Sequence, residues 1–212
     1  MGENKWRHQY IHMIVQSATL AGIDFGSQLA GTTVIAFLQN QAVCFAQSSK
    51  KKSADTFILD WVENLRPTLI GIDAPLSLPG VYQLGNPYED YHFREADRLL
   101  KAMSPMFLGG LTARAMQLKT QLSKQFSTQI IEVYPAQLII TLQLPATYYK
   151  KKHSEIAPMV AQLQELYPFS FSAESVLTWH HLDALLALWS TWRYQQGNSL
   201  CFGNQEEGVI IV

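Results

Sequence analysis

Four acidic residues of this chain stand among apolar residues, where charged side chains are rare. Two end the runs Ala-Gly-Ile-Asp and Ile-Gly-Ile-Asp, one lies within Ile-Ile-Glu-Val, and one lies within His-Leu-Asp-Ala-Leu-Leu: they are Asp24, Asp73, Glu132 and Asp183. Charged residues are seldom fully buried without a partner or a metal ion. Four of them in one small chain therefore predict a shared site.

Carboxylates that are forced together repel each other unless a cation lies between them. Ligand sets made only of oxygen favour Mg²⁺, Mn²⁺ or Ca²⁺ over zinc. Two such ions about 4 Å apart can activate water and stabilise the leaving oxygen in phosphodiester cleavage. We therefore expect Asp24, Asp73 and Asp183 to hold Mg²⁺ or Mn²⁺, with Glu132 assisting.

The first half of the chain predicts three antiparallel strands, a helix and a parallel strand. Short turns join the first three strands, which requires a meander, whereas the fourth strand follows a helix and so runs parallel to the strand before it. The expected strands are 19–25, 32–38, 43–47 and 69–73, and the helix is 53–66. If the first and fourth strands are neighbours, Asp24 and Asp73 lie side by side.

The second half alternates helices with one more strand. An irregular, proline-rich segment at 74–90 precedes a helical insert; long loops of this kind are usually functional or mobile. The expected elements are helices at 93–103 and 111–126, a strand at 129–134, a helix from Pro135, helices at 156–166 and 173–194, and a final edge strand at 209–212. The pattern predicts an α/β fold: a mixed five-stranded sheet, three strands antiparallel and then two parallel, flanked by helices and carrying a helical insert.

Length and composition narrow the class of protein. The 212 residues favour a single domain from residue 18 to the end, with residues 1–17 forming either a mobile arm or an extra edge element. The net charge of −1 excludes a strongly basic domain, although six of the 16 Lys and Arg residues form two runs, 50–52 and 150–152, which could grip phosphates. Two distant cysteines and the lack of a long apolar stretch predict a cytoplasmic protein without disulfides or membrane spans.

Several motifs together resemble the ribonuclease-H-like superfamily, and in particular a family of predicted nucleases of RNase H fold (domain of unknown function 429). The first acidic motif, Gly-Ile-Asp-Phe-Gly, is followed by the meander typical of the superfamily. The family pattern is visible in Asp-Ala-Pro-Leu at 73–76, Arg-Glu-Ala-Asp-Arg at 94–98, Arg114, Glu-Val-Tyr-Pro at 132–135, Leu-Asp-Ala-Leu at 182–185 and Glu-Gly-Val-Ile at 207–210. The resemblance runs from about residue 20 to the end and implies a metal-dependent nuclease.

A histidine near the last aspartate adds to this resemblance. Some Holliday-junction resolvases of the superfamily place an acidic residue or a histidine one helical turn before that aspartate. His180 stands three residues before Asp183, so both can share one helix face, whereas His181 cannot. The resemblance implies that His180 is a ligand or a base; a packed helix histidine is the ordinary alternative.

Other polar residues have two interpretations each. Arg94, Asp97, Arg114 and Lys150 are expected to contact the substrate, with the basic residues among them on its phosphates. The alternatives are a surface ion pair between Arg94 and Asp97, and a structural pairing of Glu132 with Arg94 or Arg114. Tyr148 and Tyr149 stand beside a lysine run and could stack on bases or be ordinary loop aromatics.

These observations favour a divalent-metal-dependent nuclease acting on DNA or RNA, with Asp24, Asp73, Asp183, Glu132 and His180 as its catalytic groups. One alternative is a non-catalytic module that binds nucleic acid or protein through the same cleft. A second is a phosphoryl-transfer enzyme, because Gly-Ile-Asp-Phe-Gly-Ser also resembles the first phosphate loop of actin-like ATPases, although those have two such lobes. The sequence leaves the oligomeric state open, a dimer included.

Overall fold

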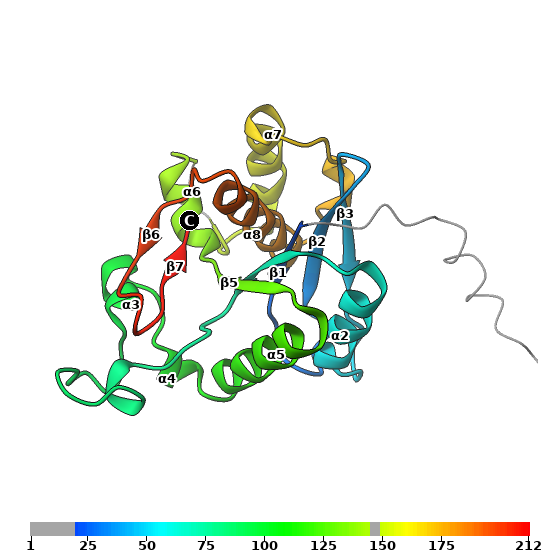
Figure 1. Cartoon of the computed structure of the whole chain (residues 1–212). Helices are drawn as coiled ribbons and strands as arrows, with labels where there is room; N and C mark the ends of the chain where they lie inside the picture. The colour runs from blue at the N-terminus through cyan, green and yellow to red at the C-terminus, as the bar shows by residue number, and fades with distance from the viewer. Residues whose placement is uncertain (1–19, 145–148) are drawn as a thin grey trace, which may run out of the picture.

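The computed structural model describes residues 20–144 and 149–212, so the expected arm at 1–17 and Tyr148 lie outside the described residues. Five strands form one sheet in the order β3–β2–β1–β4–β5 (Figure 1). β1 and β3 each pair antiparallel with β2, whereas β1–β4 and β4–β5 are parallel. The strands are β1 (Leu20–Asp24), β2 (Val34–Gln39), β3 (Ala42–Gln47), β4 (Leu69–Asp73) and β5 (Gln129–Glu132). The predicted mixed five-stranded sheet is confirmed.

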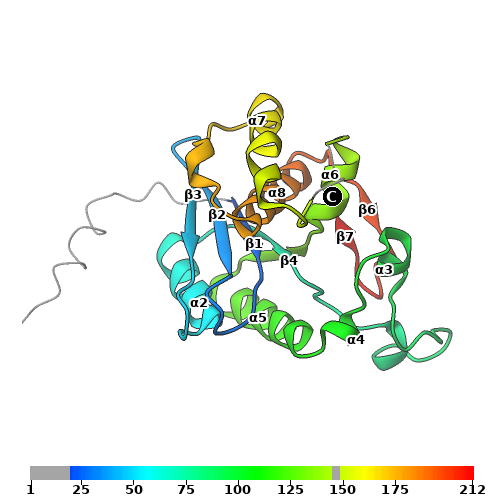
Figure 2. The same ribbon diagram turned by 180° about the vertical axis from the view of Figure 1, so that it is seen from behind.

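Helices cover both faces of this sheet. Figure 2 shows α2 and α5 on one side and α8 with α7 on the other, and the apolar core divides accordingly into two clusters. The helices are α2 (Ala54–Leu65), α3 (Glu95–Leu100), α4 (Pro105–Leu108), α5 (Gly110–Phe126), α6 (Pro135–Thr141), α7 (Ile156–Leu166) and α8 (Trp179–Gln195), with short 3₁₀ turns at Gly80–Tyr82, His153–Glu155 and Ala173–Ser175. No helix among the described residues is long and apolar enough to cross a membrane.

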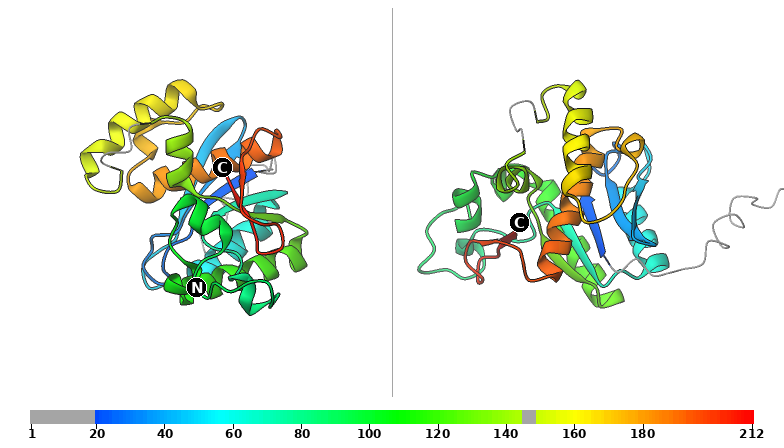
Figure 3. Two further views of the ribbon diagram at one scale, coloured as in Figure 1. Left: turned by 90° about the vertical axis from the view of Figure 1, so that its left-hand side faces the viewer. Right: turned by 90° about the horizontal axis from the view of Figure 1, so that it is seen from above.

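Two expectations about the C-terminal part are wrong. The helix predicted at 173–194 is instead a 3₁₀ turn followed by α8, because Val176 leaves the helical backbone (φ −93°, ψ 78°) and buries its side chain in the core. The strand predicted at the edge of the main sheet is β7 (Ile210–Ile211), which pairs with β6 (Cys201–Phe202) in a separate two-stranded sheet. Only an isolated bridge joins Val133 to Ile211, and Figure 3 shows this hairpin beside α3.

α8 lies unusually close to the middle of the sheet because two paired glycines have no side chain. Gly22 of β1 and Gly71 of β4 are register partners. A Cβ on Gly22 would lie 1.9 Å from the backbone N of Leu188, and a Cβ on Gly71 would lie 2.1 Å from Oγ1 of Thr191. The depth at which α8 packs, and so the position of every side chain on it, depends on these two glycines.

Replacing Gly22 with Ala is expected to lower the free energy of unfolding by about 2–3 kcal/mol, the usual cost of overpacking a core. The added methyl group meets backbone atoms of α8 and cannot be accommodated by a change of rotamer. Urea unfolding followed by circular dichroism measures the loss. Gly110→Ala is the matched control, since no described atom beyond its chain neighbours and the backbone of its own helical turn lies within 4 Å of its Cβ position. Equal stability of the two variants would show that α8 does not require the glycine.

Candidate metal centre

The carboxyl ends of two neighbouring parallel strands place two aspartates side by side. Asp24 is the last residue of β1, Asp73 is the last residue of β4, and the two are register partners. Adjacent strands lie about 4.8 Å apart, and paired residues point to the same face. The backbone hydrogen bonds of the sheet therefore fix the separation between these two residues.

α8 brings the third aspartate to the same point. Ala187 packs on Gly22 and Gly71, and Asp183 lies one helical turn before it on the same face of α8. One carboxylate oxygen from each of Asp24, Asp73 and Asp183 lies within 4.8 Å of the others. Asp183 is completely buried, Asp24 is nearly so, and Asp73 is half-buried. The three residues predicted as metal ligands are thus brought together.

The electrostatics of this cluster disfavour three negative charges. Burial raises the pKa of Asp73 well above its ordinary value, and the neighbouring Asp183 and Asp24 raise it further. Burial likewise raises the pKa of Asp183 to about 6, although the positive charge of Lys150 opposes the rise. A cation placed among the three carboxylates would stabilise their charged forms.

The donor set fits a hard divalent cation. All three side chains offer carboxylate oxygens, and the cluster contains no described cysteine. Oxygen ligands of this kind suit Mg²⁺, Mn²⁺ and Ca²⁺ and are poor for zinc. Asp24, Asp73 and Asp183 would supply the ligands, and the choice between Mg²⁺ and Mn²⁺ stays a prediction.

His180 contacts the cluster from the first turn of α8. Its Nδ1 lies 2.6 Å from Oδ2 of Asp24, and 43% of its side chain is exposed. The hydrogen bond to Asp24 raises the pKa of His180 above its usual value. His181 points elsewhere, with its Nδ1 2.9 Å from Oγ1 of Thr178 and its ring against Phe45. The predicted difference between the two histidines is therefore seen in their contacts, while the chemical role of His180 stays a prediction.

Two residues that precede α7 reach Asp183. The Tyr149 hydroxyl donates a hydrogen bond to Oδ1 of Asp183, and Nζ of Lys150 lies 2.6 Å from Oδ2. Burial raises the pKa of the Tyr149 phenol, and the charge of Asp183 adds to the rise. Burial alone would lower the pKa of Lys150, but Asp183 and Asp73 raise it on balance. Lys150, expected on a substrate phosphate, is instead paired with the acidic cluster.

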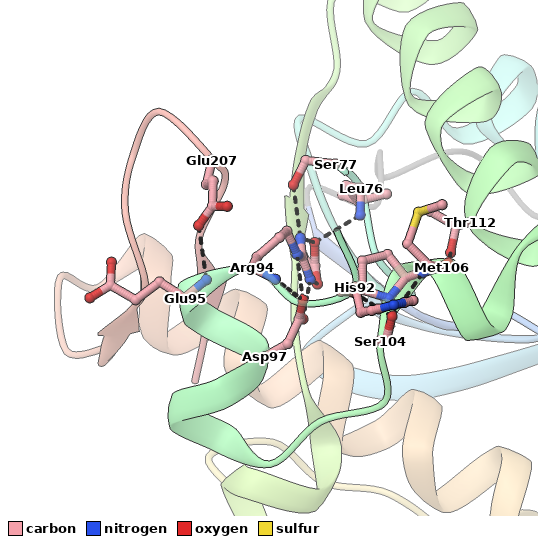
Figure 4. Close-up of polar contacts among 12 residues, drawn as sticks. Leu76, Ser77, His92, Arg94, Glu95, Asp97, Ser104, Met106, Thr112 and Glu207 are labelled. Atoms are coloured by element: carbon pink, nitrogen blue, oxygen red, sulfur yellow. Dashed lines mark hydrogen bonds and ion pairs between the residues drawn. The ribbon is translucent and has the colours of Figure 1, made fainter. Parts of the chain in front are cut away.

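Arg94 is buried in an ion-pair network, which corrects its expected contact with substrate (Figure 4). Its guanidinium donates to both carboxylate oxygens of Asp97 and to both of Glu132. Arg94 is 0% exposed and Asp97 is 1% exposed, so neither side chain is accessible to a substrate in this structure. The structure matches the alternative in which Glu132 pairs with Arg94. Burial raises the pKa of Glu132, and the Arg94 guanidinium opposes the rise.

This network holds the turn that follows Asp73. Oε2 of Glu132 accepts a hydrogen bond from the backbone N–H of Leu76 at 2.8 Å, and Arg94 donates to Oγ of Ser77 at 2.8 Å. Both partners lie within four residues of Asp73. Arg94, with Asp97 and Glu132, therefore helps to position Asp73. Arg94 itself does not contact the three aspartates of the cluster.

Arg114 holds the turn that follows Asp24, as Arg94 holds the turn that follows Asp73. Its guanidinium donates two hydrogen bonds to the carboxylate of Asp55, at 3.0 and 2.6 Å, and one to the backbone oxygen of Gly26 at 3.2 Å. It also lies over the ring of Phe25, 4.7 Å from the centroid. These contacts hold the turn after β1 and pair Arg114 with Asp55, while its expected contact with a substrate phosphate stays a prediction.

A cleft of about 310 Å³ opens on the acidic cluster. Asp24, Asp73 and Lys150 line one part of it, and apolar side chains of the helical insert, among them Met103 and Leu108, line another. The exposed lysines at 50–52 follow β3, whose carboxyl end lies at the same edge of the sheet as those of β1 and β4. The cleft therefore combines acidic and apolar walls, with basic residues at two places around that edge.

No family model matches the sequence, and no curated protein matches it. The resemblance to the family of predicted nucleases therefore stays a prediction. Among solved structures, the chain is similar to RuvC of Thermus thermophilus, with a TM-score of 0.42 at 15% identity. It is also similar to T. thermophilus RuvC in complex with a Holliday junction substrate, with a TM-score of 0.44 at 15% identity. Each alignment covers 84% of this chain and 96% of the RuvC chain. At this level of similarity, the chemistry of the site has to be judged from its own residues.

Proposed function

We propose that this protein is a divalent-metal-dependent nuclease. The observation that carries the proposal is the convergence of Asp24, Asp73 and Asp183: one carboxylate oxygen of each lies within 4.8 Å of the others, and Asp24 and Asp73 line a cleft. When bound there, Mg²⁺ or Mn²⁺ would act as a Lewis acid toward a phosphodiester and lower the pKa of a bound water. The exposed lysines at 50–52 support a polyanionic substrate, DNA or RNA.

Among the residues that the structure describes, His180 is the group best placed to move a proton. Its Nδ1 faces Asp24, so the neutral imidazole carries its proton on Nδ1 and keeps a lone pair on Nε2. In hydrolysis the water oxygen bonds to phosphorus, the P–O ester bond breaks, and the leaving oxygen takes up a proton. His180, partly exposed beside the cluster, would accept the proton that the water loses. Both carboxylate oxygens of Glu132 accept hydrogen bonds from Arg94. Glu132 would therefore act on Asp73 indirectly, by holding the turn that follows it.

Mn²⁺ titration calorimetry and a cleavage screen on the same preparation test this function. The screen uses labelled single-stranded, duplex and branched DNA and RNA, each with Mn²⁺ and with EDTA. We expect saturable Mn²⁺ binding and metal-dependent cleavage by the parent protein. Asp24→Asn should lose the binding and at least about 100-fold in cleavage rate, since metal ligands contribute several kcal/mol to such reactions.

Glu63→Gln is the matched control, because Glu63 is an exposed carboxylate on α2 outside the cluster. It should bind Mn²⁺ and cut like the parent protein. Undiminished cleavage by correctly folded Asp24→Asn would refute the assignment. A parent protein that neither binds Mn²⁺ nor cuts any substrate would support the non-catalytic binding module instead.

A further inference from the structure

Both carboxylate oxygens of Asp183 are engaged by two consecutive residues of one loop. Oδ1 accepts the hydroxyl hydrogen of Tyr149, and Oδ2 lies 2.6 Å from the ammonium group of Lys150. Asp183 itself is fixed, since its side chain is 1% exposed and it lies in the second turn of α8, whose residues His181 to Thr191 are all buried. The contacts thus bring a positive charge from the chain itself to the buried carboxylate of the cluster.

We propose that Lys150 is a tethered counter-ion that competes with the divalent cation for Asp183, so that the metal ion binds with full affinity only when Lys150 moves away. The inference rests on the proposed function, because it concerns the same three carboxylates. An ammonium group 2.6 Å from a ligand oxygen and a divalent cation on that oxygen repel each other at very short range. The two positive charges therefore cannot both have their most favourable contact with Asp183.

Lys150 rather than Asp183 is the partner that can move. Its side chain is 49% exposed, so it can leave the carboxylate for solvent without opening the core. Tyr149 is anchored more firmly, because its ring packs edge-on against Trp179 with centroids 5.5 Å apart. Tyr149 is therefore a positioning residue, which keeps Asp183 oriented and holds the next residue within reach of it.

The test is Mn²⁺ titration calorimetry near neutral pH on four proteins: the parent, Lys150→Met, Lys151→Met and Asp73→Asn. If Lys150 is paired with Asp183 in about nine molecules of ten, only about one molecule in ten can bind Mn²⁺ with full affinity. The apparent affinity for Mn²⁺ is then weakened about tenfold, because it scales with the fraction of molecules that can bind. Lys150→Met should therefore bind Mn²⁺ about tenfold more tightly than the parent. Lys151→Met removes an exposed charge next to Lys150 and should bind within about twofold of the parent.

The four proteins separate the failure of this inference from that of the proposed function. If Asp73→Asn loses Mn²⁺ binding but Lys150→Met binds like the parent, the competition is refuted and the metal site stands. An equal gain of Mn²⁺ affinity in Lys150→Met and Lys151→Met also refutes the competition, because the gain then comes from the loss of any nearby positive charge. If Asp73→Asn binds like the parent, the metal site itself is wrong. Lys150→Gln, with thermal unfolding as a check, replaces Lys150→Met should that variant misfold.

Discussion

Replacing Arg94 with Met is expected to lower the free energy of unfolding by about 3–5 kcal/mol, the usual cost of removing one partner from a buried ion pair. Arg94 is completely buried, and its guanidinium is the cation that Asp97 and Glu132 share. Without it, two buried carboxylates face each other with no positive charge between them. The cost is therefore a desolvation penalty as well as the loss of hydrogen bonds.

Arg98→Met is the matched control for this change, because Arg98 lies on α3, directly after Arg94, and also pairs with an aspartate. That pair, with Asp90, is at the surface: the Arg98 side chain is 58% exposed. Exposed pairs of this kind contribute at most about 1 kcal/mol. Urea unfolding of both variants measures the difference, and a loss below about 1 kcal/mol in Arg94→Met would contradict the buried network.

Replacing Asp73 with Asn is expected to stabilise the metal-free protein while it removes metal binding. Burial and the charges of Asp183 and Asp24 hold the pKa of Asp73 well above its ordinary value, so its ionised form opposes folding. A neutral amide of the same shape avoids that repulsion. At a pH of about 8 in EDTA, we expect Asp73→Asn to unfold with a free energy at least about 1 kcal/mol higher than that of the parent.

The pH dependence of the parent gives the sign of this effect. The folded-state pKa of Asp183, at about 6, exceeds the value of roughly 3.9 in an unfolded chain. Between these values the folded protein binds more protons than the unfolded chain, so stability rises as the pH falls through about 6 and the gain is complete near 4. Urea unfolding of the parent in EDTA should thus give a higher free energy near pH 5 than near pH 8. The advantage of Asp73→Asn should shrink over the same range.

Mn²⁺ should reverse the order of the two proteins. A cation that binds only the folded parent stabilises it by RT ln(1 + [Mn²⁺]/Kd), about 2.7 kcal/mol at one hundred times Kd. Asp73→Asn lacks one of the three carboxylates, so Mn²⁺ should stabilise it little. The thermal midpoint of the parent should therefore rise above that of the variant when Mn²⁺ replaces EDTA. Parallel shifts in both proteins would mean that the ion binds somewhere else.

The sheet and its acidic cluster could be predicted because their signals are local. An apolar run that ends in aspartate marks the end of a buried strand, and the short turns between the first three strands require an antiparallel meander. A helix between two strands then makes the next pair parallel. From these steps alone Asp24 and Asp73 become neighbours, as their register shows.

The contacts of the charged partners could not be predicted in the same way. Arg94 and Asp97 have the spacing of an ordinary surface pair, and they are buried by tertiary packing that involves β5, the segment after β4 and the C-terminal hairpin. Lys150 and Tyr149 contact Asp183 because of the path that their loop takes. The spacing of polar and apolar residues does not predict that path. The sequence alone allows Tyr149 to stack on bases or to be an ordinary loop residue. Its nearness to Asp183, 34 positions away, has no signal in the sequence.

The register of β1 with β4 has a consequence for how such a chain could change over generations. Asp24 and Asp73 are spaced by strand pairing, and Asp183 is placed by the depth of α8 over Gly22 and Gly71. Insertions or deletions between Ser77 and Arg94, beyond the turn that the Arg94 and Glu132 network holds, would leave all three anchors untouched. That segment leads into the insert that forms the apolar wall of the cleft. The fold thus separates an acidic cluster of constant geometry from a cleft entrance whose length and sequence are free to diversify.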